Sequence, residues 1–93
     1  MRARIYCDDK YEAQKLASLI FVKDSAETNI VSILNTVKDE IVIELKDKSA
    51  HSILLRDESN VEVFADFVQS VLEGNHKIQQ AITSGTMVEI IKA

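Results

Sequence analysis

The chain has 93 residues, a formal net charge of −4 at neutral pH, 46% hydrophobic residues, no proline and a single cysteine, Cys7. This length predicts one domain over 1–93, and the acidic balance disfavours a free-standing nucleic-acid binder, which usually presents a basic face. One cysteine excludes an internal disulfide and a thiolate metal cage. We expect no signal peptide, because Asp8 and Asp9 interrupt the apolar run near the amino end. No stretch approaches the roughly 20 apolar residues that a membrane span requires, so we expect a cytoplasmic protein.

The amino-terminal part predicts a strand followed by a helix. Residues alternate between apolar and polar over Arg2–Cys7, which is typical of a half-buried strand. Asp8 or Asp9 then caps a helix that runs to about Phe21. The inner stripe of this helix consists of Ala13, Leu16, Ala17 and Ile20.

The next part predicts a β-hairpin. After a polar loop at Lys23–Asn29, apolar residues mark strands at Ile30–Val37 and Ile41–Lys46. Lys38 and Asp39 form the turn between these two strands. In the second strand the inward residues are Ile41, Ile43 and Leu45.

Two interpretations fit the segment that follows the hairpin. In the first, Ser49 caps a single long helix that ends at Gly74. Its apolar stripe would consist of Ala50, Ile53, Leu54, Val61, Phe64, Ala65, Val68, Val71 and Leu72. In the second, Ala50–Arg56 is another strand and the helix begins near Ser59, because the polar run 57–60 interrupts the stripe.

The tail completes the expected α+β fold. We expect a short helix at His76–Ser84, ended by Gly85, and a final strand at Thr86–Lys92. The predicted architecture is an antiparallel sheet of three or four strands with two main helices on one face, in the order β-α-β-β-α, with a core at 2–73 and a tail at 75–92. It becomes a ferredoxin-like plait if the tail strand lies beside the first strand. No internal repeat is visible.

No residue pattern indicates a reaction, a metal site or a cofactor. His51 and His76 lie far apart and have no cysteine or aspartate at ligand spacing. Cys7 ends the inward row of the first strand, and the aspartates that follow it supply no net positive charge, so we expect a small buried side chain. We therefore expect a protein that is not an enzyme.

Three features resemble the small dimerising (Pcc-type) subunit of the KEOPS complex, which makes the threonylcarbamoyl modification on adenosine in tRNA. The first helix begins with Tyr11-Glu12-Ala13, and the hairpin ends in the alternating run Ile41–Leu45. A leucine-arginine pair, Leu55-Arg56, precedes Asn60 by the spacing typical of this family. The resemblance covers about residues 2–73.

The resemblance implies a scaffold that forms a homodimer or a heterodimer with a paralogue and docks a large ATP-binding transferase subunit. It implies tRNA contact only within the complex. The candidate interface residues are Leu55, Arg56, Asn60, Val61, Phe64, Phe67, Val68, Val71 and Leu72. The apolar residues of this set serve either partner contact or the core of the chain. Phe67 lies off the main apolar stripe, so we expect it to be an exposed anchor.

Two alternatives stay open from the residues alone. Arg2, Arg4 and Tyr6 share one face of the first strand, where they can contact RNA phosphate and stack a base, or form an ordinary solvated face. The alternative function is a ferredoxin-like module for protein interaction or for sensing a small ligand.

Overall fold

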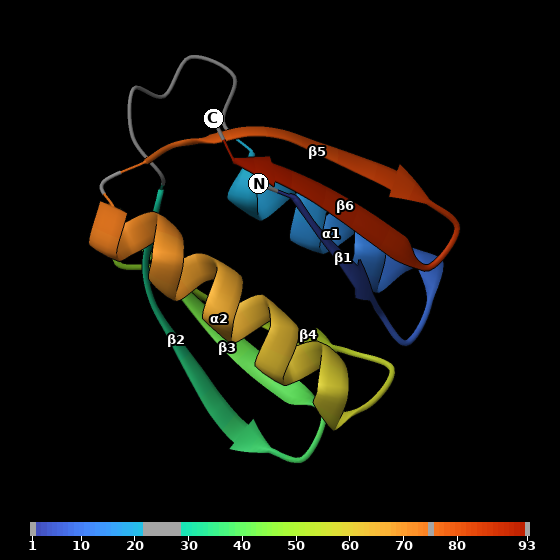
Figure 1. Ribbon diagram of the computed structural model, residues 1–93. Helices are drawn as coiled ribbons and strands as arrows, with labels where there is room; N and C mark the ends of the chain where they lie inside the picture. The colour runs from blue at the N-terminus through green and yellow to red at the C-terminus, as the bar shows by residue number, and fades with distance from the viewer. Residues whose placement is uncertain (1, 22–28, 75, 93) are drawn as a thin grey trace.

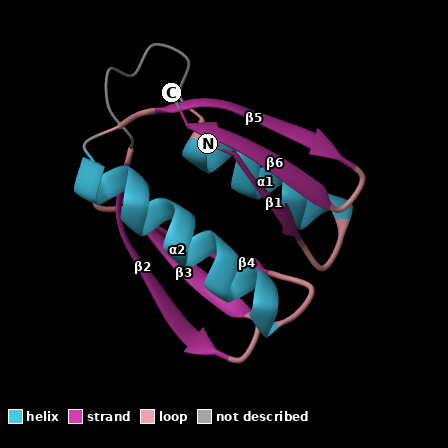
Figure 2. Ribbon diagram, in the orientation of Figure 1, coloured by secondary structure: helices cyan, strands magenta, loops and turns pink. Residues whose placement is uncertain are grey.

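The computed structural model describes residues 2–21, 29–74 and 76–92 and has an α+β fold (Figure 1). Its elements are β1 (Arg2–Tyr6), α1 (Lys10–Ile20), β2 (Ile30–Val37), β3 (Glu40–Leu45), β4 (Ala50–Leu54), α2 (Glu58–Gly74), β5 (Ile78–Ser84) and β6 (Met87–Lys92). The described strands form two antiparallel three-stranded sheets, β1-β6-β5 and β2-β3-β4 (Figure 2).

The predicted elements of the first half are confirmed. The Asp9 carboxylate accepts a hydrogen bond of 2.9 Å from the Glu12 N–H and so caps α1. The hairpin of β2 and β3 turns at Lys38-Asp39, because Val37 pairs with Glu40. The inward row of β3 is buried as expected. The predicted loop Lys23–Asn29 lies outside the described residues except for Asn29.

The prediction of one long helix from Ser49 is wrong, and the alternative with a strand first is confirmed. Ala50–Leu54 forms β4 and pairs with β3 along its whole length. The Asp57 carboxylate then accepts hydrogen bonds from the N–H groups of Ser59 and Asn60. The polar run that interrupted the apolar stripe is therefore the start of α2.

The predicted helix at His76–Ser84 is also wrong, because this segment is the edge strand β5. Ser84 pairs with Met87, and Gly85 between them has a φ of 61°, which glycine adopts readily in a hairpin turn. The core consequently extends beyond the predicted range 2–73. Its buried residues in the tail are Ile78, Val88 and Ile90.

The ferredoxin-like plait does not form, although β6 lies beside β1 as that prediction required. β3 pairs with β2 and β4 and not with β1, so there are two sheets where one was predicted. The two helices also do not cover one sheet: α1 packs on β5 and β6, whereas α2 spans from β1 to β2. Figure 1 shows α2 in front of β2-β3-β4 and α1 behind the other sheet.

The chain contains a structural repeat that the sequence did not reveal. A β-α-β-β unit occurs first as β1-α1-β2-β3 and again as β4-α2-β5-β6. Each unit contributes its first strand to the sheet of the other unit, since β1 pairs with β6 and β4 pairs with β3. The two units are therefore interlocked, and neither sheet is built from one unit alone.

The two sheets meet where β1 and β4 cross. Cys7 and Leu55 form an isolated antiparallel bridge at this point. The Asp8 N–H donates to the Leu54 carbonyl at 3.0 Å, and the Arg56 N–H donates to the Tyr6 carbonyl at 2.9 Å. These two hydrogen bonds are related by the approximate two-fold symmetry of the repeat, which places the symmetry axis at the crossing.

Next to the crossing, each helix supplies an acceptor to the strand of the other unit. The Tyr6 N–H donates to Asn60 Oδ1 on α2 at 2.9 Å. The Leu54 N–H donates to Glu12 Oε2 on α1 at 2.9 Å. Asn60 is the buried polar side chain among the described residues, with 7% of its surface exposed.

We predict that Asn60→Ala destabilises the fold, because it leaves the partly buried Tyr6 N–H without its acceptor. The expected loss in the free energy of unfolding is about 1–3 kcal/mol, measured by urea denaturation. Gln14→Ala, at an exposed position on α1, is the control and should leave the midpoint almost unchanged. Equal midpoints for the two variants would contradict the role of Asn60.

Candidate interaction site

Most of the predicted interface residues form the core of the single chain. Seven of the nine side chains are buried: Leu55, Asn60, Val61, Phe64, Phe67, Val68 and Val71. Arg56 is exposed, and Leu72 has 37% of its surface exposed. Of the predicted set, only these two side chains are at the surface of the described chain.

The prediction that Phe67 is an exposed anchor is wrong, because only 5% of its surface is exposed. The reason is that α2 contacts both β1 and β2, so its buried face is wider than a single stripe. Val63, one turn earlier on α2, is 45% exposed and is the apolar side chain that protrudes instead.

Two mainly apolar hollows among the described residues lie along α2, one beside β2 and one beside β1. The first, of about 190 Å³, lies between α2 and β2 and is lined by Ile33, Ala65, Val68, Gln69 and Leu72. The second, of about 300 Å³, lies between α2 and β1 and is lined by Ala3, Val63, Asp66, Phe67 and Ser70. We call the first the α2–β2 hollow and the second the β1–α2 groove.

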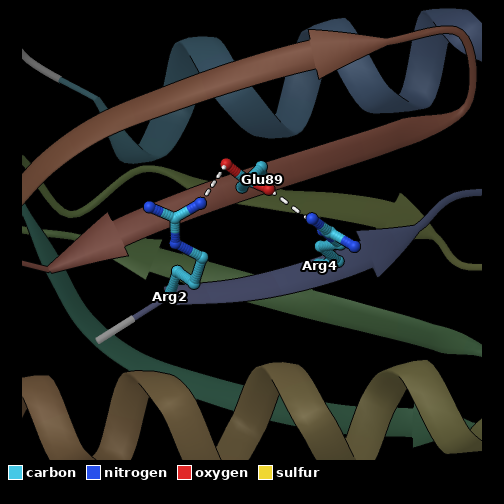
Figure 3. Close-up of polar contacts among 3 residues, drawn as sticks. All are labelled: Arg2, Arg4 and Glu89. Atoms are coloured by element: carbon cyan, nitrogen blue, oxygen red, sulfur yellow. Dashed lines mark hydrogen bonds and ion pairs between the residues drawn. The ribbon is translucent and has the colours of Figure 1, made fainter.

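The structure brings the predicted RNA-contact residues Arg2 and Arg4 to one carboxylate (Figure 3). Arg2 Nη1 lies 3.4 Å from Glu89 Oε1, and Arg4 Nε lies 3.0 Å from Glu89 Oε2. The hydrogen bond that Arg4 donates to Glu89, together with the negative charge of Glu89, raises the pKa of Arg4. Because one carboxylate serves two exposed guanidinium groups, the cluster keeps a net positive charge.

Arg56 also contributes to this face, although the predicted set contained only Arg2, Arg4 and Tyr6. Its guanidinium lies over the Tyr6 ring at 4.6 Å from the ring centroid and donates to Thr86 Oγ1 at 3.0 Å. This cation–π contact covers one face of Tyr6, which leaves less of the ring for stacking a base. The contact depends on the crossing of β1 and β4, which no local pattern in the sequence indicates.

The titratable side chains of the described ranges do not assemble into a metal site: no group of three or more His, Cys, Asp and Glu residues converges. His51 contacts the Ser49 hydroxyl at 2.9 Å. The Ser49 hydroxyl also donates to Asp47, and this hydrogen bond lowers the pKa of the Asp47 carboxyl. These contacts organise the turn between β3 and β4.

Comparisons with protein-family models, curated proteins and solved structures found no match to this chain. In the described residues, neither helix has the length and apolar character needed to cross a membrane. Any assignment of function therefore depends on the surfaces described above and on the resemblance in the sequence.

We predict that the Cys7 thiol is unreactive in the folded protein. Cys7 is fully buried, and this burial, together with the charges of Glu12 and Asp9, raises the pKa of the thiol to about 12. Iodoacetamide at pH 8 should label the unfolded chain in urea at least tenfold faster than the native chain. Equal labelling rates would contradict the buried position.

The same shift predicts a pH dependence of stability. The buried neutral thiol makes its full contribution to the free energy of unfolding below the pKa of the thiol in the unfolded chain, roughly 8.5. The contribution falls as the pH rises from there toward about 12, the pKa in the folded chain. Cys7→Ala should show less loss of stability over this range than the wild-type chain does, as measured by urea midpoints.

Proposed function

We propose that this chain is a non-catalytic scaffold subunit that dimerises and docks the ATP-binding transferase of a KEOPS-type complex, which acts in threonylcarbamoyladenosine modification of tRNA. The observation that carries the proposal is the exposed apolar surface of α2 at the α2–β2 hollow. In the family that the sequence resembles, the transferase docks through its own helices against those of the small subunit. An apolar hollow beside a helix is the kind of surface that accepts a partner helix.

Leu72 is the residue on which this surface depends. It is the apolar member of the predicted interface set that stays exposed, and it borders the α2–β2 hollow together with Ile33. A partner helix that covers Leu72 would bury apolar surface worth roughly 25 cal/mol for each Å² removed from water.

The position of β2 at the edge of its sheet, among the described strands, supports dimerisation. β2 is an edge strand of its sheet, and its apolar side chains Val31 and Leu34 are 47% and 58% exposed. An edge strand with exposed apolar side chains is a typical site of pairing between chains. A second copy joined along β2 would leave the α2–β2 hollow of each copy for a transferase subunit.

We predict that Leu72→Asp abolishes capture of the purified transferase subunit but leaves the mass of the dimer in light scattering unchanged. Leu34→Lys should instead give a folded monomer, because a charged side chain on the edge of β2 opposes pairing. Glu73→Gln, which alters the neighbouring exposed position on α2, is the control for capture. A monomeric wild-type chain, or capture by Leu72→Asp at the wild-type level, would contradict the proposal.

A second candidate, tRNA contact within the complex, is favoured by the three arginines near Glu89 and Tyr6. Phosphate groups would have to compete with Glu89 for Arg2 and Arg4. We therefore predict that Glu89→Gln strengthens retention of the assembled complex on tRNA and makes the dependence on salt steeper. Glu44→Gln, on the other sheet, is the matched control and should change neither property.

A further inference from the structure

The edge of β1 that faces away from β6 is only partly paired. Cys7 donates its N–H to the Thr86 carbonyl at 2.8 Å, on the side of β6. Since backbone groups alternate in direction along a strand, Tyr6 and Arg4 point their backbone N–H and C=O groups the other way, toward α2. Both groups of Tyr6 are paired, to Asn60 and Arg56. For Arg4 no described residue pairs with either group on this edge.

The internal repeat provides a direct comparison, because Ser52 of β4 occupies the position equivalent to Arg4. There the carbonyl of Ser52 accepts a hydrogen bond of 2.7 Å from Lys15 Nζ on α1. The position on α2 equivalent to Lys15 is Val63. A lysine that covers a strand edge prevents the addition of another strand. The edge of β4 is therefore covered by Lys15, whereas the equivalent edge of β1 has no such cover at Arg4.

The β1–α2 groove reaches β1 at Ala3, the residue next to Arg4. Its lining combines apolar surface from Ala3, Val63 and Phe67 with the polar groups of Asp66 and Ser70. Val63 projects into solvent beside it. No ion pair to Asp66 occurs within the described ranges, so this carboxylate is available to a positive charge that comes from outside.

We propose that the β1–α2 groove binds an extended segment of a partner protein by strand addition to β1. The segment pairs its backbone with the N–H and C=O of Arg4. It places one apolar side chain beside Val63 and Phe67 and a lysine or arginine against Asp66. Free backbone groups at a strand edge select an extended chain, because a helix has already paired its own backbone groups. This inference deepens the proposed scaffold role by naming a second kind of partner segment, and it uses a surface separate from Leu72.

The negative charge of Asp66 favours a basic peptide over RNA as the partner in this groove. RNA would bring phosphate groups toward Asp66, in a chain whose net charge is already −4. A basic, apolar peptide has the complementary charge and pairs with the edge as well. The groove therefore fits a peptide better than a nucleic acid.

The test uses a fluorescent ten-residue peptide of alternating valine and lysine, titrated into the full chain while backbone amide shifts are followed by NMR. Binding should shift the Arg4 amide and its neighbours in β1 most strongly. A peptide with two central prolines, which lack the N–H donor, should bind at least tenfold more weakly, and so should one with glutamate in place of lysine.

The matched variants are Val63→Lys and Gln14→Lys, which make a neutral position on a helix basic in the same way. Val63→Lys restores the cover seen at Lys15 in the other unit, so it should weaken peptide binding at least tenfold. Gln14→Lys, at an exposed position on α1, should bind as the wild type does. Circular dichroism checks that both variants are folded.

The proposal would be overturned by unchanged binding of Val63→Lys, by equal binding of the proline peptide, or by amide shifts centred on another edge strand, such as β2 or β5. A fall in mass from dimer to monomer on Val63→Lys would also overturn it, because the groove would then be an interface between copies. The scaffold proposal is tested separately. Leu72→Asp should bind the peptide normally while losing the transferase, and Val63→Lys should do the reverse.

Discussion

The whole structure depends on the crossing of β1 and β4 at Cys7 and Leu55. Two reciprocal hydrogen bonds hold the strands together there, and both side chains at the crossing are buried. The strands cannot continue as an ordinary ladder, because the first turns of α2 and α1 lie next to the crossing and supply Asn60 and Glu12 as acceptors. These two side chains accept from N–H groups that the diverging strands would otherwise leave without a partner in the protein, and so they allow the two sheets to diverge.

This constraint explains why two short units make one stable domain. Each unit contributes a strand to the sheet of the other, so the core forms only when both are present. A chain of this size buries a modest share of the surface that it exposes when unfolded. Exchanging a strand widens each sheet, so more apolar surface is buried between the sheets and the helices. Differences between equivalent positions then distinguish the two halves. Lys15 covers a strand edge in one half, whereas Val63 leaves the equivalent edge open in the other.

Local patterns in the sequence predicted the elements well where alternation and capping agree, as at Asp9 and in the hairpin of β2 and β3. They failed at β5, because its edge position makes it mostly polar and conceals the strand period. The repeat was invisible because only buried positions and the capping aspartates recur, such as Asp9 and Asp57. An apolar stripe also cannot distinguish a core from an interface, and for this reason Phe67 was placed wrongly.

β1 contributes to two different surfaces, a face with arginine side chains and an open strand edge. Its outer face holds the arginines that share Glu89, and its open edge faces the β1–α2 groove. A segment added along that edge becomes a new strand of the same sheet, so its outward side chains would lie beside Arg2 and Arg4. Basic residues in such a segment would enlarge the positive face in a chain whose net charge is −4. Any contact of this face with RNA would then depend on the partner segment.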